Sequence, residues 1–133
     1  MKPKTVSRIT INGNRFRVVY AAVFGPHGRQ FLGRVCHDRN EITFDYDMPE
    51  EEWRRIYIHE LLHAAVWYLG EEAVDNLSRK LDEDLNDIPA GRWKDWICAA
   101  LTEWFAEFRF DACHNIAADM ARELKRAGFL PKR

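Results

Sequence analysis

The sequence lacks the paired cysteines of a structural zinc site or a redox motif. Its three cysteines, Cys36, Cys98 and Cys113, are widely spaced, and no two of them form a C-x-x-C pair. An odd number of isolated cysteines is typical of buried free thiols in a reducing compartment. We therefore expect a cytoplasmic protein in which cysteine takes no part in the chemistry.

Long apolar runs and an excess of charge of one sign are also missing. No stretch approaches the length of a membrane span, and no apolar segment of the kind found in signal peptides follows Met1. The 20 Lys and Arg residues nearly balance the 21 Asp and Glu residues. Composition therefore indicates neither a nucleic-acid partner nor an acidic membrane surface. The oligomeric state is left open.

What the chain does have is enough apolar and aromatic material for one core. Its 133 residues, with five Trp and eight Phe, suit a single domain spanning residues 1–133. The N-terminal third alternates apolar and polar residues. Asn12-Gly13-Asn14 predicts one β-hairpin, and Asp38-Arg39-Asn40 predicts the turn of a second strand pair over residues 31–46. We expect a small antiparallel sheet of three to four strands.

From Pro49 onward the apolar period becomes helical. One helix is predicted to run from there to Gly70, a residue suited to a left-handed helix end. An amphipathic helix is predicted over residues 71–88, an aromatic-rich helix over residues 93–108 and a last stretch over residues 116–127. The aromatic stripe is interpreted as core. The fold class is therefore α+β, a small sheet followed by one central helix and two to three further helices.

The first of these helices carries His59-Glu60-Leu61-Leu62-His63, an H-E-x-x-H motif. Residues four apart lie one above the other on a helix, so the two imidazoles can converge on one Zn²⁺ ion. Glu60 lies beside the pair and can take a proton from a water whose pKa the metal lowers to roughly 7. The motif is set among apolar residues, where histidines are costly to bury unless something satisfies their nitrogens. We interpret His59 and His63 as zinc ligands and Glu60 as the general base.

With this motif the sequence resembles the zincin metallopeptidases, in which a small antiparallel sheet precedes the motif helix. The span from Gly33 to Glu72 looks especially like the short metallopeptidases encoded by phages and prophages. The resemblance covers roughly half of the chain, and only the H-E-x-x-H motif in it is sharply diagnostic. It implies a zincin-like domain that hydrolyses peptide bonds with zinc as its cofactor, and a peptide or protein as its substrate.

A catalytic zinc has three protein ligands and one open position, so a third ligand is required. The metzincin pattern is excluded because Val66 and Leu69 occupy the positions of its Gly and its third His. The gluzincin-like pattern takes a Glu from a later helix, and the segment over residues 101–108 is similar to the one that supplies it. This resemblance implies Glu103 as the ligand, with Glu107 one turn beyond it.

Glu71 is the alternative third ligand, because it matches the position that the phage-type enzymes use. The difficulty with Glu71 is the distance from its side chain to the two histidines. If the motif helix continues to Gly70, it rises about 10 Å beyond His63, a distance that a Glu side chain cannot easily recover. We therefore prefer Glu103 to Glu71, and place Glu107 third.

The predicted function is zinc-dependent peptide hydrolysis, with a substrate added as a strand if residues 41–46 form the exposed edge of the sheet. Two alternatives stay open. One is a non-catalytic zinc-binding module that uses its aromatic C-terminal half to bind a protein. The other is a regulatory protease specific for one partner protein, which generic substrates would not reveal.

Overall fold

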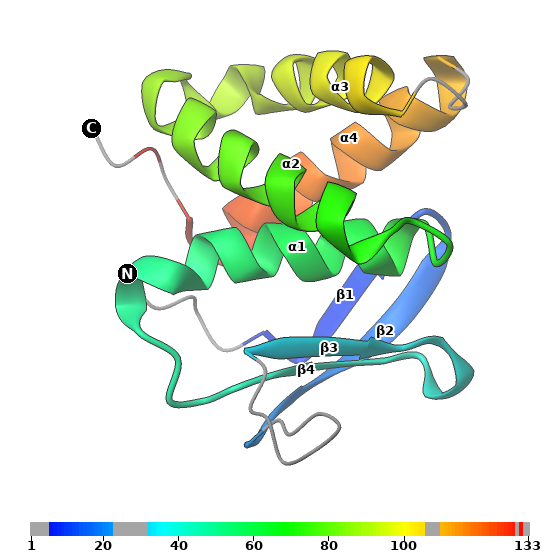
Figure 1. Ribbon diagram of the computed structural model, residues 1–133, viewed down its shortest axis with the longest axis vertical. Helices are drawn as coiled ribbons and strands as arrows, with labels where there is room; N and C mark the ends of the chain where they lie inside the picture. The colour runs from blue at the N-terminus through cyan, green and yellow to red at the C-terminus, as the bar shows by residue number, and fades with distance from the viewer. Residues whose placement is uncertain (1–5, 23–31, 106–109, 130, 132–133) are drawn as a thin grey trace.

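The computed structural model describes residues 6–22, 32–105, 110–129 and 131, and the predicted α+β class is confirmed. A four-stranded sheet has α1 packed against it, and α2 and α3 lie beyond α1 (Figure 1). The strands are β1 Arg8–Ile11, β2 Asn14–Tyr20, β3 Gly33–Cys36 and β4 Glu41–Phe44. The helices are α1 Trp53–Ala65, α2 Glu71–Asp84, α3 Trp93–Trp104 and α4 Phe110–Arg126. Within the described ranges, no helix has the length and apolar character needed to cross a membrane.

Both predicted strand pairs form. The β1–β2 hairpin turns at Asn12 and Gly13, whose φ angles of 50° and 80° give the left-handed geometry that such tight turns require. The β3–β4 pair is antiparallel and turns through a short 3₁₀ helix, His37–Arg39, that ends at Asn40 with a φ of 48°. These are local features, and the turn residues alone determine them.

The prediction of an all-antiparallel sheet is wrong, because β2 and β4 pair in parallel within the order β1-β2-β4-β3. The turn residues determine pairing only inside each hairpin, and burial decides how the two hairpins join. Ile42 and Phe44 of β4 are fully buried, so β4 takes an interior position beside β2. The half-exposed β3 is left at the edge. Residues 41–46 are therefore not the edge strand.

The motif helix α1 is buried on most of its surface because it lies between the sheet and the outer helices (Figure 1). A 3₁₀ turn, Glu50–Glu52, precedes it. On the sheet side Tyr57 stacks on Phe44 with ring centroids 5.0 Å apart. On the other side the buried Arg54 donates a 2.6 Å hydrogen bond to Asp82 of α2. Contacts on both sides fix the position of α1, and hence of the motif.

Side chains of α4 satisfy the outer edge of β1. The backbone N–H of Thr10 donates to Glu123 at 3.3 Å, and Arg122 donates to the carbonyl of Thr10 at 2.8 Å. Arg126 donates to the carbonyl of Arg8. An unpaired sheet edge readily recruits another strand, and these bonds remove that possibility at β1. Among the described strands, β3 is left with the unpaired edge.

The aromatic stripe is only partly core. Trp93 is fully buried, whereas Trp96 and Trp104 are exposed on α3. This helix ends at Trp104 and not at residue 108, because Phe105 has a non-helical backbone (φ −127°, ψ 85°). The prediction of a buried stripe over the whole segment is wrong for the two exposed tryptophans. Residues 106–109 lie outside the described part of the chain.

Candidate metal centre

His59 and His63 project from the same face of α1, as their four-residue spacing predicts. Their Nε2 atoms are 3.1 Å apart and their ring centroids 4.9 Å apart. The side chain of His59 is 10% exposed and that of His63 is 17% exposed. Two imidazoles are thus held together in a largely buried place, with the same nitrogen of each ring facing the other.

The chain turns back directly after this pair, because α1 ends at Ala65. Val66 has an extended backbone (φ −140°, ψ 99°), and the side-chain amide of Asn12 donates a 2.9 Å hydrogen bond to the carbonyl of Ala65. Val66 and Leu69 are buried and anchor the reversal. The prediction that the helix continues to Gly70 is wrong: Gly70 has a φ of −68° and precedes the first residue of α2.

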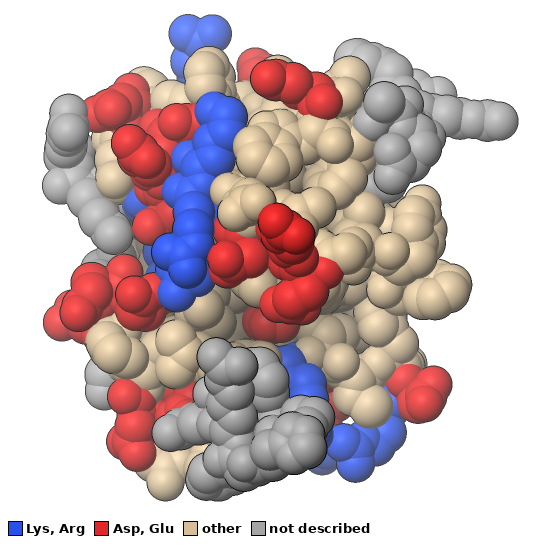
Figure 2. Space-filling model, in the orientation of Figure 1, with Lys and Arg blue, Asp and Glu red and all other residues tan. Residues whose placement is uncertain are grey.

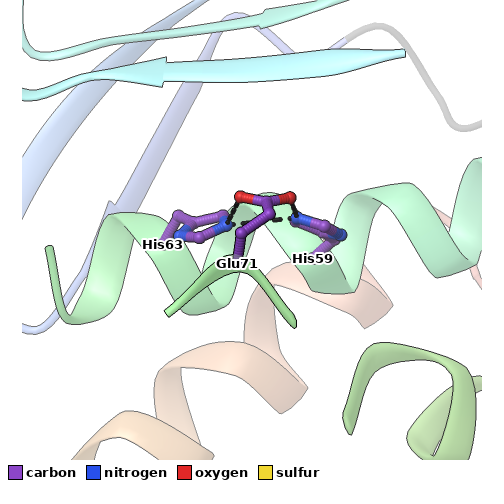
Figure 3. Close-up of side chains that lie close together, drawn as sticks. All are labelled: His59, His63 and Glu71. Atoms are coloured by element: carbon purple, nitrogen blue, oxygen red, sulfur yellow. Dashed lines mark hydrogen bonds and ion pairs between the residues drawn. The ribbon is translucent and has the colours of Figure 1, made fainter. Parts of the chain in front are cut away.

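This reversal brings Glu71 to the two histidines. Its Oε1 lies 2.8 Å from Nε2 of His59, and its Oε2 lies 2.9 Å from Nε2 of His63 (Figure 3). Among the described residues, these three form the group of His, Cys, Asp and Glu side chains whose ligand atoms all lie within 4.8 Å of one another. The difficulty of reach that placed Glu71 behind Glu103 is therefore absent.

The donor set fits a zinc ion. Two imidazole nitrogens and one carboxylate are the ligands of a common type of catalytic zinc site, which binds them at about 2.0 to 2.2 Å. The side chain of Glu71 is 74% exposed, so the group opens to solvent on the side of α2. Asp and Glu side chains gather in the middle of the face drawn in Figure 2, at the place where Figure 1 shows α2. An ion held by these residues would have solvent access for a further ligand.

Glu60 lies next to His59 on α1 but is almost completely buried. Burial raises the pKa of its carboxyl to about 8, and the negative charge of Glu71 adds to the effect. The carboxyl lies against Gly33 of β3: a Cβ atom at Gly33 would be 2.9 Å from Cγ and 3.0 Å from Oε2 of Glu60. The glycine thus leaves room for this carboxyl between α1 and the sheet.

The other ring nitrogen of His59 faces a second carboxylate. This nitrogen, Nδ1, is buried and has no hydrogen-bond partner among the described residues, and Oδ1 of Asp75 lies 3.6 Å away. Asp75 is itself held by Arg79, at 3.1 Å, and by Arg55, at 3.5 Å. A carboxylate behind a ligating histidine fixes the tautomer and the orientation of its ring.

The protonation of His59 also suits a ligand. Burial lowers the pKa of His59, although the carboxylate of Glu71 opposes this effect. The lowered pKa favours the neutral imidazole, which is the form that binds a metal.

Glu103 does not join this group. It is exposed on α3, where its charge contributes to raising the pKa of Lys80. Glu107 lies outside the described residues. Of the candidate residues predicted from the sequence, the structure therefore brings together His59, His63 and Glu71, with Glu60 beside them on α1.

Comparison with protein-family models, with curated proteins and with solved structures finds no match to this chain.

Two residues beside the group, Asp75 and Gly33, were not predicted from the sequence as part of the site. Asp75 follows Glu71 by four residues and so shares its helix face, a spacing that could have pointed to it. Gly33 carried no local signal, because its role depends on how closely β3 approaches α1. Such a contact between distant parts of the chain is not visible in sequence periodicity.

Proposed function

We propose that this protein is a zinc-dependent peptidase whose metal ligands are His59, His63 and Glu71. The observation that carries the proposal is the meeting of these three side chains at 2.8 to 3.1 Å, with the buried Glu60 adjacent on the same helix. Zinc, when bound, would supply a water of lowered pKa and would polarise the carbonyl of the scissile bond.

Glu60 performs the proton transfers. As a carboxylate, it accepts the proton of the attacking water and then donates it to the nitrogen of the leaving amine. A pKa raised by burial makes this carboxyl a stronger base than an ordinary glutamate. A positive ion beside it would favour its ionised form, so the metal and the base act together.

The open edge of β3 is the proposed binding strand for an extended substrate. The backbone N–H of Asp45 donates a hydrogen bond to the carbonyl of Leu32. Because every second residue of an antiparallel strand bonds to its partner strand, the backbone groups of Arg34 and Cys36 also bond to β4. The backbone groups of Gly33 and Val35 then point away from β4. A peptide that adds to this edge would lie beside Glu60, because Gly33 contacts that carboxyl.

The test is to measure zinc content and the cleavage of a generic peptide library for the wild type and for Glu60→Gln. We expect one zinc per chain in both proteins, and a rate of hydrolysis that is about 10² to 10⁴-fold lower in the variant than in the wild type. Retained cleavage by Glu60→Gln would exclude the mechanism. Stoichiometric zinc without Glu60-dependent cleavage of any peptide would favour the non-catalytic zinc-binding module instead.

A further inference from the structure

The near-zero net charge hides a separation of charge between the two sides of the molecule. The helix α2 carries six acidic and two basic residues. The sheet shows the opposite sign on the face turned away from the helices. Because side chains alternate along a strand and Ile9, Phe16, Val18 and Ile42 are buried against the helices, their neighbours in each strand point to the other face.

This outer sheet face is rich in arginine. Its members, from the register of the four strands, are Arg8, Thr10, Arg15, Arg17, Val19, Arg34, Cys36, Glu41 and Thr43. The four arginines are exposed, and with one glutamate they give the face a net charge of +3. No described helix covers it (Figure 1).

Among the described residues, Arg17 is the one arginine of this face that forms an ion pair. Arg17 pairs with Glu41, and that hydrogen bond is the largest cause of the lowered pKa of Glu41, to which the charge of Arg34 also contributes. Within the described part of the chain, the guanidinium groups of Arg8, Arg15 and Arg34 have no hydrogen bond or ion pair. Arg8 stands directly opposite Arg17, a like-charge pair that destabilises the sheet.

The composition of the face favours one kind of partner over others. Protein interfaces have cores rich in aromatic residues and poor in charge, whereas interfaces with nucleic acids are polar and strongly positive. Of the nine residues on this face two are apolar, Val19 and Cys36, and none is aromatic. Arginine binds phosphate through a planar fork of donors. Without aromatic side chains the face cannot stack on unpaired bases, which favours a duplex backbone over a single strand.

We propose that the outer sheet face binds the phosphate backbone of a nucleic-acid duplex, independently of base sequence, through Arg8, Arg15 and Arg34. The face lies on the opposite side of the sheet from Glu60 and the metal centre, so the proposal does not rest on the proposed peptidase activity.

The experiment measures the binding of the full chain to a short fluorescent DNA duplex by anisotropy over a range of salt concentrations. If the protein contacts three phosphates, the logarithm of the binding constant should fall linearly with the logarithm of the salt concentration. The expected slope is about −2.7, at about −0.9 per contact. The triple variant R8Q/R15Q/R34Q is expected to bind at least about tenfold more weakly at low salt, with a slope near zero. The triple lysine variant R8K/R15K/R34K keeps the charge and is expected to keep the slope.

The matched control removes three basic residues from the helical side, R92Q/K94Q/K125Q, and is expected to bind within about twofold of the wild type. Absence of duplex binding at low salt, equal loss in the control, or tighter binding to a single strand of the same length would overturn the proposal. The proposal would also be overturned if the wild type did not bind the duplex and the triple glutamine variant differed from it in oligomeric state. The arginine-rich face would then be an interface between two copies of the chain, packed against the acidic α2 of the other copy.

Discussion

A Cβ atom at Gly33 would lie 2.9 Å from Cγ of Glu60, so the edge strand and the proposed general base occupy adjoining space. This contact links the sheet to the chemistry of the motif helix. It makes the position of the Glu60 carboxyl depend on the absence of a side chain at Gly33.

Gly33→Ala is therefore expected to impair catalysis without removing the metal. The added methyl group displaces the Glu60 carboxyl, and a displacement of about 1 Å at a reacting group can reduce kcat/KM by about 10²-fold. Zinc affinity should stay within about twofold, because the three atoms nearest to the added methyl group belong to Glu60 and not to a ligand. Gly91→Ala is the control, since a Cβ atom there meets nothing within 4 Å. Unchanged kcat/KM in Gly33→Ala would show that this contact does not position Glu60.

The third ligand can be identified by comparing Glu71→Gln with Glu103→Gln. Removing the carboxylate charge of Glu71 is expected to weaken zinc binding at least about 10²-fold, because an amide is a poor substitute for a charged ligand. Glu103→Gln should bind zinc like the wild type, since Glu103 is exposed on α3 outside the cluster. Competition with a chromophoric chelator measures both affinities. The opposite ranking would restore Glu103 as the ligand.

Asp75→Asn tests whether Asp75 holds the ring of His59. Loss of this kind of outer carboxylate typically costs about 10- to 100-fold in metal affinity or activity. We expect weaker zinc binding and a lower kcat, with the fold retained. Asp95→Asn, an exposed acid on α3, serves as the control. Equal zinc affinity in the two variants would show that Asp75 does not hold the ring of His59 for metal binding.

The stability of the metal-free protein is expected to depend on pH through Glu60. In the unfolded chain this carboxyl has its ordinary pKa of 4.5, whereas in the folded protein burial raises the pKa to about 8. Between these values the folded state keeps a proton that the unfolded state has lost, so the free energy of unfolding falls as the pH rises.

Glu60→Gln removes this titration. In the absence of metal, its melting temperature should exceed that of the wild type by several degrees near pH 8 and match it near pH 4.5. Calorimetry at the two pH values checks the prediction. A difference between the two proteins that does not change with pH would mean that Glu60 has no raised pKa in the metal-free fold.

The parts of the fold that the sequence predicted are those with local causes. Asn12 and Gly13 require the geometry of a tight hairpin turn whatever surrounds them, and the four-residue spacing of His59 and His63 is sufficient to place them on one helix face. The parallel pairing of β2 with β4 has no such local signal, since it follows from the burial of Ile42 and Phe44 in the assembled core.

The preference for Glu103 over Glu71 rested on a helix end that the structure does not have. Val66, Trp67 and Leu69 continue the apolar helical pattern of α1, so periodicity extends the helix to Gly70. In the fold, Asn12 from the distant hairpin bonds to the carbonyl of Ala65, and the chain turns at Val66. The five residues from Val66 to Gly70 therefore form a return segment between α1 and α2 instead of a further helical turn.

The most direct test of the proposed metal centre is a crystal structure of the zinc-loaded protein with anomalous diffraction recorded at the zinc absorption edge. We expect one anomalous peak within about 2.0 to 2.2 Å of Nε2 of His59, Nε2 of His63 and a carboxylate oxygen of Glu71, with a further position open to solvent. A peak that does not contact Glu71, or no peak at the two histidines, would contradict it.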